Sequence, residues 1–346
     1  MSAQRRLAVL PVDDARGAST RYRVLAYLPA LRAAGFDPHV HDPLRTRGTL
    51  AGAARIADLT RDVAAASRAE VVLVHRKMYP PPFAGRLRRA ASRLVLDIDD
   101  AVDLPPPGRE LDRRTRERYR RNFDATAAAA DLVVCGNAEL ERRVPHERTV
   151  RLPTPVDTAR FRPDALGPPR PLTLGWVGHS DNLRYLERLL PVLRELAGRH
   201  PAFSLIVVAD RPPAIDGVPI EFRRWSLEQE ISCFDGIAVG LMPLEDGEWA
   251  RSKCAFKAIQ YMALGIPPVV SPVGMNREVV EHGISGFLAA DAGQWIEAIE
   301  TLFSRPELAA SIGAAGRRVV ERRYSLAANA PLLIDALRGV GRTARC

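Results

Sequence analysis

The sequence is poor in cysteine and contains no long apolar run, and each shortage excludes a class of protein. Its four cysteines, at positions 135, 233, 254 and 346, form no Cys-x-x-Cys pair and no cluster with histidine. That spacing argues against a zinc site and against a disulfide framework. No apolar stretch approaches the roughly 20 residues that a membrane-spanning helix needs. We therefore expect a cytoplasmic protein in a reducing compartment, peripheral at most to the inner face of a membrane.

Aromatic residues are also scarce, at 6% of the chain. They do not alternate with the basic runs, which argues against a nucleic-acid partner. The net charge of +9 lies wholly in the first half, where residues 1–168 hold 30 basic and 21 acidic side chains. Much of the excess falls in residues 86–93 and 109–121. This distribution predicts either an anionic partner, such as a membrane surface or a phosphorylated acceptor, or a solvated arginine-rich helix face.

Several catalytic signatures are missing. The sequence contains no P-loop, no complete Gly-x-Gly-x-x-Gly with a ribose-binding acid, and no recognisable Ser/His/Asp triad. These absences argue against a kinase, an ordinary dehydrogenase and a hydrolase.

Short apolar runs alternate with helical patterns along the whole chain. In the first half the expected strands are Leu7–Val12, Val71–His75, Leu94–Ile98 and Leu132–Cys135, and the expected helices cover residues 20–34, 51–67, 109–129 and 137–143. In the second half the expected strands are Leu172–Val177, Phe203–Ala209, Ile237–Met242 and Pro268–Ser271, and the expected helices cover residues 182–199 and 253–264. This alternation predicts βαβ units and parallel sheets.

A proline-rich segment, Arg162–Pro171, separates the two halves and has the composition of a linker. We therefore expect an N-terminal Rossmann-like domain over residues 1–165 and a C-terminal one over residues 166–326. Residues 327–346 would form a helical tail able to pack back on the N-terminal domain. Two such domains that face each other would hold ligands in a cleft, at the carboxyl ends of their strands.

The distribution of lysine points to one segment. The chain has three lysines among its 50 basic residues, and two of them, Lys253 and Lys257, lie four positions apart. We expect a helix to begin near Ser252, so both ammonium groups would project from one face of its first turns. The N-terminus of a helix favours anions, and this segment therefore predicts a diphosphate site. The alternative is a solvated amphipathic face.

The same region resembles a known family. Met262–Gly274 and Asn276–Leu288 are similar to the donor-domain signature of glycosyltransferase family 4, the large retaining GT-B family. Gly175–Ser180, Leu152–Asp157 and Gly17–Arg23 resemble other conserved segments of that family. The resemblance implies an α/β protein of the GT-B fold, with two facing Rossmann-like domains, parallel sheets and an interdomain cleft.

The resemblance also implies an activity. It implies transfer of a sugar from a nucleotide diphosphate sugar to an acceptor, which could be lipid-linked, a glycan or a small molecule, with retention at the anomeric carbon. The implied donor-binding residues are Gly17, Gly178, His179, Arg251, Lys253, Lys257, Gln260, Gly274, Asn276 and Glu278. The implied acceptor-side residues are Arg21, His75, Arg76, Asp99 and Asp100, and the candidates for catalysis are Lys253, Lys257 and Asp100.

One departure from the family leaves other functions open. The two glutamates that the family usually carries fall here on Ser252 and Gln260. Carboxylates hold sugar and ribose hydroxyls about twice as strongly as neutral groups do. Gln260 could still bond a ribose hydroxyl, whereas Ser252 is too short to replace a glutamate, so Glu248 or Glu278 would have to supply a carboxylate. The alternatives are a catalytically weak nucleotide-sugar-binding partner subunit and a GT-B-fold nucleotide-sugar 2-epimerase.

Two further features have competing interpretations. The run Asp97-Ile-Asp-Asp100 looks like a metal-binding Asp-x-Asp, but enzymes of the resembled family do not generally need a metal, so neither a metal nor a cofactor is expected. Asp99 and Asp100 follow a strand and either face an acceptor or cap a turn. His75 with Arg76, and His179, either line the ligand site or are structural.

Overall fold

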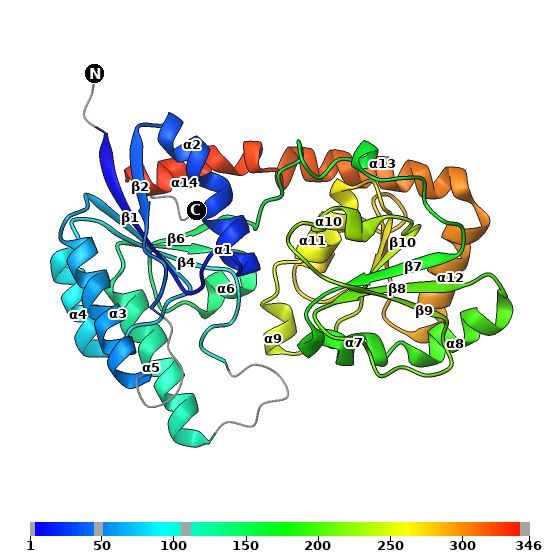
Figure 1. The fold of residues 1–346 in the computed structure, drawn as a ribbon, viewed down its shortest axis with the longest axis horizontal. Helices are drawn as coiled ribbons and strands as arrows, with labels where there is room; N and C mark the ends of the chain where they lie inside the picture. Colours follow the sequence, from blue (N-terminus) through cyan, green and yellow to red (C-terminus); the bar gives the residue numbers. More distant parts are fainter. Residues whose placement is uncertain (1–3, 45–50, 105–111, 340–346) are drawn as a thin grey trace. The chain divides into compact units, whose positions relative to one another are not determined.

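A computed structural model describes residues 4–44, 51–104 and 112–339 of the chain. The chain forms two compact units, each built on a six-stranded parallel sheet (Figure 1). The first unit comprises Met1–Pro155, Ser252–Cys254 and Leu326–Cys346, and the second comprises Val156–Arg251 and Ala255–Ser325. The prediction of two Rossmann-like parallel sheets is confirmed. The proline-rich segment 162–171 lies inside the second unit, where Pro163–Ala165 form a 3-10 turn, η3.

The first sheet has the strand order β2-β1-β3-β4-β5-β6. Its strands are β1 (Arg5–Pro11), β2 (Phe36–Val40), β3 (Val71–His75), β4 (Leu94–Ile98), β5 (Leu132–Cys135) and β6 (Thr149–Arg151). Every residue of β3, β4 and β5 is buried, because helices cover both faces of a parallel sheet, and this produces the apolar runs in the sequence. The edge strands β2 and β6 were not predicted. β2 contains Pro38, which only an edge strand accommodates easily.

Helices pack on both faces of this sheet (Figure 1). They are α1 (Ala18–Arg23), α2 (Leu28–Ala33), α3 (Ala51–Ala66), α4 (Pro81–Ala90), α5 (Arg113–Ala129), α6 (Ala138–Arg143) and α14 (Leu326–Arg338), with a 3-10 turn, η1 (Leu25–Tyr27). The helix expected over residues 20–34 is interrupted at Val24, whose ψ of −68° at φ −121° is not helical. Asp112 caps α5, and the expected start of that helix at residue 109 lies outside the described residues.

The second sheet has the strand order β12-β11-β10-β7-β8-β9. Its strands are β7 (Thr173–Val177), β8 (Ser204–Ala209), β9 (Ile220–Arg224), β10 (Val239–Met242), β11 (Pro268–Val270) and β12 (Phe287–Leu288). Its helices are α7 (Leu183–Glu187), α8 (Leu190–Arg199), α9 (Glu248–Arg251), α10 (Phe256–Ala263), α11 (Asn276–Val279), α12 (Ala292–Ser304) and α13 (Pro306–Arg323), with the 3-10 turns η4 (Ser180–Asn182) and η5 (Ser232–Phe234). The single helix expected over residues 182–199 is divided into α7 and α8, and a proline lies in the first turn of α8.

In each sheet the order of the strands reverses at one position. In the first unit the chain runs from β1 outward to β2 and then resumes at β3 on the other side of β1. In the second unit it runs from β7 to β8 and β9 and then resumes at β10 on the other side of β7. Ligands of open α/β sheets bind outside the carboxyl ends of the strands at such a reversal. The carboxyl ends of β1 and β3, and those of β7 and β10, are therefore where each unit should bind a ligand.

No helix within the described ranges combines the length and the apolar character that crossing a bilayer requires.

Candidate active site

A buried polar cluster lies where the strand order of the first sheet reverses. Ser19 stands in the first turn of α1, just after β1, and His75 is the last residue of β3. Ser19 Oγ lies 2.9 Å from His75 Nε2 and donates a hydrogen bond to Asp99 Oδ2 at 2.5 Å. On the other side of the ring, His75 Nδ1 lies 2.7 Å from Asp97 Oδ2. The structure thus brings the predicted residues His75 and Asp99 together through a serine that the sequence did not single out.

Arg23 carries the charge that balances this cluster. Its side chain is fully buried, its Nε donates to Asp97 Oδ2 at 2.9 Å, and its Nη2 donates to the other carboxylate oxygen. Its Nη1 donates to the backbone oxygen of Leu152 at 2.7 Å. Burial by itself would raise the pKa of Asp97, but Arg23 and His75 outweigh burial and hold that pKa at about 2. Asp97 is therefore a carboxylate at neutral pH.

Arg76 holds the outer part of the cluster. Its φ of 54° puts a residue other than glycine in the left-handed region, which typically costs about 1–3 kcal/mol and persists only where surrounding contacts impose it. The contacts here are two carboxylates, since Arg76 Nε lies 3.4 Å from Asp99 Oδ1 and its Nη2 lies 3.4 Å from Asp100 Oδ2. Burial opposes ionisation of Asp99, but Arg76 and His75 lower its pKa. Asp99 and Asp100 are thus paired with an arginine.

Ser19, His75 and Asp97 are connected in the order of a Ser/His/Asp triad, an arrangement that the sequence did not reveal. A triad serine, however, donates its proton to the histidine, whereas Ser19 donates to the Asp99 carboxylate. The oxygen of Ser19 is then left to accept from His75 Nε2, and Nδ1 must donate to the Asp97 carboxylate. All three contacts are satisfied when His75 carries protons on both nitrogens. These hydrogen bonds therefore hold the side chains of the cluster in a fixed polar network and do not activate Ser19 as a nucleophile.

The spacing of Ser19 and Arg23 in the sequence is a signal that could have identified both residues. Ser19 and Arg23 are four positions apart in a short helix, and such residues share a face. The other two residues of this loop that were predicted to bind ligands lie outside the cluster. Gly17 precedes α1, where an added Cβ would come within 2.5 Å of Asp13 Cβ, and Arg21 donates to the backbone oxygen of Arg16 at 2.7 Å.

Stability is expected to fall as the pH is lowered from about 5 to about 2. The pKa of Asp97 is about 2 in the folded protein and roughly 3.9 in an unfolded chain. Such a carboxyl stabilises the fold above its unfolded pKa, and the contribution disappears as the pH falls through the folded value. The complete loss, reached below the folded pKa, should be about 2.6 kcal/mol, and the pKa of Asp99 is lowered in the same direction. Urea denaturation at pH 7 and at pH 3 measures the part of this loss that falls above pH 3, about 1 kcal/mol, and an Asp97→Asn variant should lose less.

In the second unit, the loop that follows β7 is fixed by hydrogen bonds. The backbone N–H and the hydroxyl of Ser180 donate to the Asp210 carboxylate at 2.7 and 2.9 Å. Gly178 is packed so tightly that an added Cβ would lie 2.6 Å from the Trp176 indole. The ring of His179 is 60% exposed, and its Nδ1 accepts from the backbone N–H two residues on at 3.3 Å. A rigid loop thus presents an exposed imidazole at the carboxyl end of β7.

The prediction that Lys253 and Lys257 share one helix face is wrong. The helix α10 begins at Phe256, after a left-handed Ala255 with φ 51°. Lys253 lies in the non-helical connection between α9 and α10, and Lys257 alone stands in the first turn of α10.

The physical reason lies in the backbone of residues 252–254. Asn137 Nδ2 donates to the carbonyl oxygen of Ser252 at 2.8 Å and to that of Lys253 at 3.1 Å. The thiol of Cys254 donates to the backbone oxygen of Asp99 at 3.2 Å. These residues pack as part of the first unit. Contacts distant in sequence therefore fix this segment in a non-helical conformation that its local pattern did not indicate.

Lys257 and Gln260 meet on the first turns of α10. Lys257 Nζ donates to Gln260 Oε1 at 2.8 Å, and the Gln260 side chain is buried. The next residue, Tyr261, fixes the helix to β7, because its hydroxyl donates to Gly175 O and accepts from Val177 N, both at 3.1 Å. The structure thus holds a lysine and a buried amide beside the strand where the sheet order reverses.

The remaining predicted donor residues have different surroundings. Arg251 binds both carboxylate oxygens of Asp246, at 2.7 and 2.8 Å, so its charge is already paired. Asn276 is buried, and its amide donates to the backbone oxygen of Ser271 at 2.9 Å. Glu278 is exposed and lies in the first turn of α11.

Gly274 should not tolerate a side chain. Its φ is 52°, and an added Cβ would lie 2.5 Å from the backbone oxygen of Arg251. A Gly274→Ala protein is therefore expected to lose about 1–3 kcal/mol of stability, because the backbone must move where α9 meets the start of α11. Chemical denaturation measures this effect, with Gly247→Ala as the control, since an added Cβ there meets nothing within 4 Å. Equal stability of the two variants would contradict the prediction.

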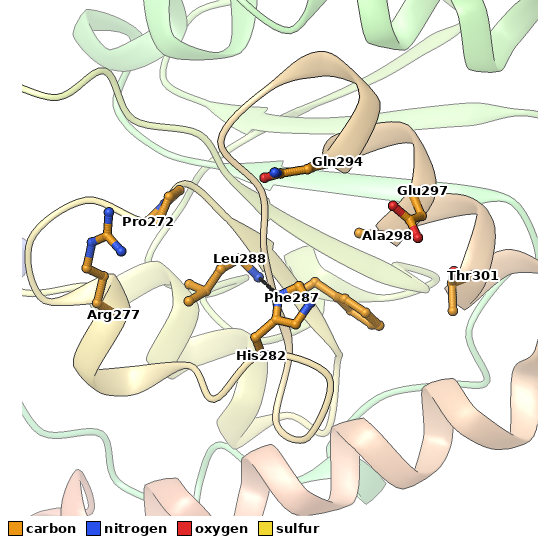
Figure 2. A pocket seen from close by; sticks show the side chains of 9 residues that line it. All are labelled: Pro272, Arg277, His282, Phe287, Leu288, Gln294, Glu297, Ala298 and Thr301. Atoms are coloured by element: carbon orange, nitrogen blue, oxygen red, sulfur yellow. Dashed lines mark hydrogen bonds between the residues drawn. The ribbon is translucent and has the colours of Figure 1, made fainter.

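A cavity of about 460 Å³ opens elsewhere in the second unit, beside β12 and α12 (Figure 2). Its lining includes Arg277, His282, Phe287 and Glu297, and His282 Nδ1 accepts from the backbone N–H of Leu288 at 3.2 Å. Such a volume is within the range of ligand pockets. The cavity lies by β11 and β12, however, and not by β7 and β10, where the reversal of strand order predicts the ligand.

Comparison with models of known protein families gives a match to the second unit. Residues 170–305 match the family model described as Glycosyl transferases group 1. No curated protein matches the sequence.

Solved structures show the same fold over nearly the whole chain. Sucrose-phosphate synthase from Thermosynechococcus elongatus is 16% identical, with a TM-score of 0.70 over 97% of this chain and 99% of that one. The HepE protein of Anabaena, solved in complex with UDP-glucose, is 13% identical, with a TM-score of 0.67 over 97% and 100%. A glycosyltransferase from Rickettsia africae is 13% identical, with a TM-score of 0.70 over 99% and 100%. Both sheets thus belong to the GT-B fold.

Proposed function

From the premise that this chain is a GT-B glycosyltransferase that uses nucleotide sugars, with its residues 170–305 in the group 1 family, we propose that it transfers a hexose-like unit to an acceptor with retention at the anomeric carbon. The observation that carries the proposal is Lys257 in the first turn of α10, 2.8 Å from the buried amide of Gln260, inside the region of the family match. A lysine at a helix N-terminus is suited to a diphosphate.

On the donor side, the charge that develops on the departing diphosphate would be stabilised by the Lys257 ammonium and by the N-terminus of α10. Preorganised charges of this kind are usually the largest single contribution to catalysis. The amide of Gln260 would hold a ribose hydroxyl. No metal is proposed, because Asp97 and Asp99, the carboxylates of the Asp-x-Asp run, are bound to cationic or serine partners.

On the acceptor side, the cluster at the ends of β1 and β3 would bind hydroxyl groups. Asp99 and Asp100 offer carboxylate oxygens, and Ser19, which also contacts His75, holds Asp99 in place. The excess positive charge of the first half of the chain favours an acceptor that is phosphorylated or lipid-linked.

A nucleotide-binding screen tests the proposal. UDP, GDP, dTDP, ADP and CMP would each be added to the protein, and the melting temperature would be measured. A ligand at 100 times its dissociation constant stabilises a protein by roughly 2.7 kcal/mol, which shifts the transition readily. The nucleotide sugar of the best binder is then offered with an acceptor panel, and the anomeric configuration of the product is determined by NMR. No response to any of the five nucleotides would rule out the proposed donor site.

A catalytically weak nucleotide-sugar-binding subunit is the second candidate. It is supported by the two residues that replace the family's glutamates, because Ser252 is fully buried and the Gln260 oxygen is already bonded to Lys257. Stoichiometric donor binding without transfer or donor hydrolysis, over the whole acceptor panel, would favour it. A 2-epimerase would instead convert the nucleotide sugar in the absence of any acceptor.

A further inference from the structure

A second cavity, of about 280 Å³, lies in the first unit between α3 and the edge of the sheet formed by β1 and β2. Its lining contains five basic side chains and no acidic one: Arg6, His39, His41, Arg61 and Arg68. Four alanines and Leu7 complete the wall. Short alanine side chains leave room beneath the basic groups, so the cavity is a recess with a cationic rim.

The charge of this rim is only partly neutralised. Arg61 Nη2 lies 3.2 Å from Asp58 Oδ1, and His39 Nε2 lies 2.8 Å from Asp37 Oδ2. Arg6 and Arg68 are exposed, and their side chains form no hydrogen bond or ion pair with any described residue. Two guanidinium groups therefore remain available at the mouth of the cavity, each with donors in a planar fork that suits an oxyanion.

The pKa of His41, another residue that lines the cavity, depends on the same charges. Its pKa is lowered, first by burial and then by the positive charges of Arg61, His39 and Lys77, while Asp62 acts in the opposite direction. The neighbouring groups therefore oppose protonation of this imidazole. An anion in the cavity would reverse that effect, since a nearby negative charge favours the charged form.

We propose that this cavity binds a phosphoryl group, at a site separate from the cluster at the ends of β1 and β3. Three arginines and two histidines around an alanine-lined recess favour a compact anion of two or more charges. The volume lies below the roughly 300–1,000 Å³ of pockets that hold whole cofactors, so the recess fits a phosphate and not a nucleotide. The phosphate could belong to a soluble phosphomonoester or to a lipid headgroup, because both present the same oxygens.

The test follows the His41 ring by NMR on histidine-labelled protein, with its resonance assigned by a His41→Gln variant. The pH titration is recorded in sodium sulfate, a dianion across this pH range, and in sodium chloride of equal ionic strength. The titration of His41 is expected to move to higher pH in sulfate. A donor-site anion would not produce this local response, so failure here and failure of the proposed function are distinguishable.

Two variants complete the experiment. An Arg6→Gln/Arg68→Gln protein should bind sulfate at least about tenfold more weakly by the same signal. Arg55→Gln removes one charge from α3 outside the cavity and should leave the affinity unchanged. The proposal is overturned if His41 does not respond to sulfate, or responds equally in the double variant.

Vesicle flotation distinguishes the two sources of phosphate. Binding to phosphatidic acid vesicles over phosphatidylcholine vesicles, lost in the double variant, would identify a lipid headgroup. A His41 response without that difference would identify a soluble phosphomonoester.

Discussion

Replacing Arg23 by methionine is expected to lower the free energy of unfolding by about 3–5 kcal/mol. The substitution keeps most of the side-chain volume but leaves the Asp97 carboxylate buried without its bidentate partner. It also leaves the backbone oxygen of Leu152 without its donor. Urea denaturation at pH 7 measures the change, and Arg32→Met, on the exposed face of α2, is the matched control.

A second substitution separates the loss of the ion pair from the loss of packing. Adding Asp97→Asn to Arg23→Met removes the uncompensated charge, and the double variant should recover part of the lost stability. If Arg23→Met were as stable as Arg32→Met, the buried pair would not be what balances the cluster. If the double variant recovered nothing, the loss would come from packing instead.

Replacing Lys257 by alanine is expected to reduce kcat by about 100- to 1,000-fold, the usual effect of removing one group that stabilises developing negative charge. The Lys257 ammonium stands in the first turn of α10, while Lys253 lies in a non-helical connection. Lys253→Ala is therefore the matched control and should have the smaller effect. The measurement is the initial rate of transfer as a function of donor concentration, with the melting temperature as a check on folding.

The result also separates binding from catalysis. If Lys257 acts on the leaving diphosphate, kcat and kcat/KM should fall together. A rise in KM at constant kcat would assign Lys257 to uniform binding of donor and transition state. Turnover at the parent rate would contradict a role of this lysine in catalysis.

The interior strands of the first sheet could be predicted from the sequence. The boundaries of β3, β4 and β5 agree with the predicted runs residue for residue. Strands buried on both faces need continuous apolar residues, which makes them visible in the sequence. The edge strands β2 and β9 were missed because one contains Pro38 and the other ends in two arginines. An edge strand is paired on one side alone and tolerates such residues.

The candidate site was less predictable, because contacts distant in sequence determine it. His75 and Asp99 were singled out as strand-end residues, but the link between them through Ser19 spans 56 positions on one side and 80 on the other. The helix expected to start near Ser252 starts at Phe256, since Asn137 binds the carbonyl oxygens of the preceding segment. The residues around Ser252 contain no pattern that predicts its hydrogen bond with the side-chain amide of Asn137, which lies 115 positions earlier.

Because α14 belongs to the first unit, the order in which the two units can fold during synthesis differs from the order in which they begin along the chain. Leu333 and Leu337 of this last helix share one apolar core with Leu7 and Val9 of the first strand. Domains usually fold in order as the chain leaves the ribosome. Here β1 is translated before the second unit, but the apolar core around β1 is complete only when α14, which follows the second unit, has been translated. The second unit, which is contiguous apart from the Ser252–Cys254 segment, can fold earlier. Translation of the first unit therefore starts before that of the second unit and ends after it.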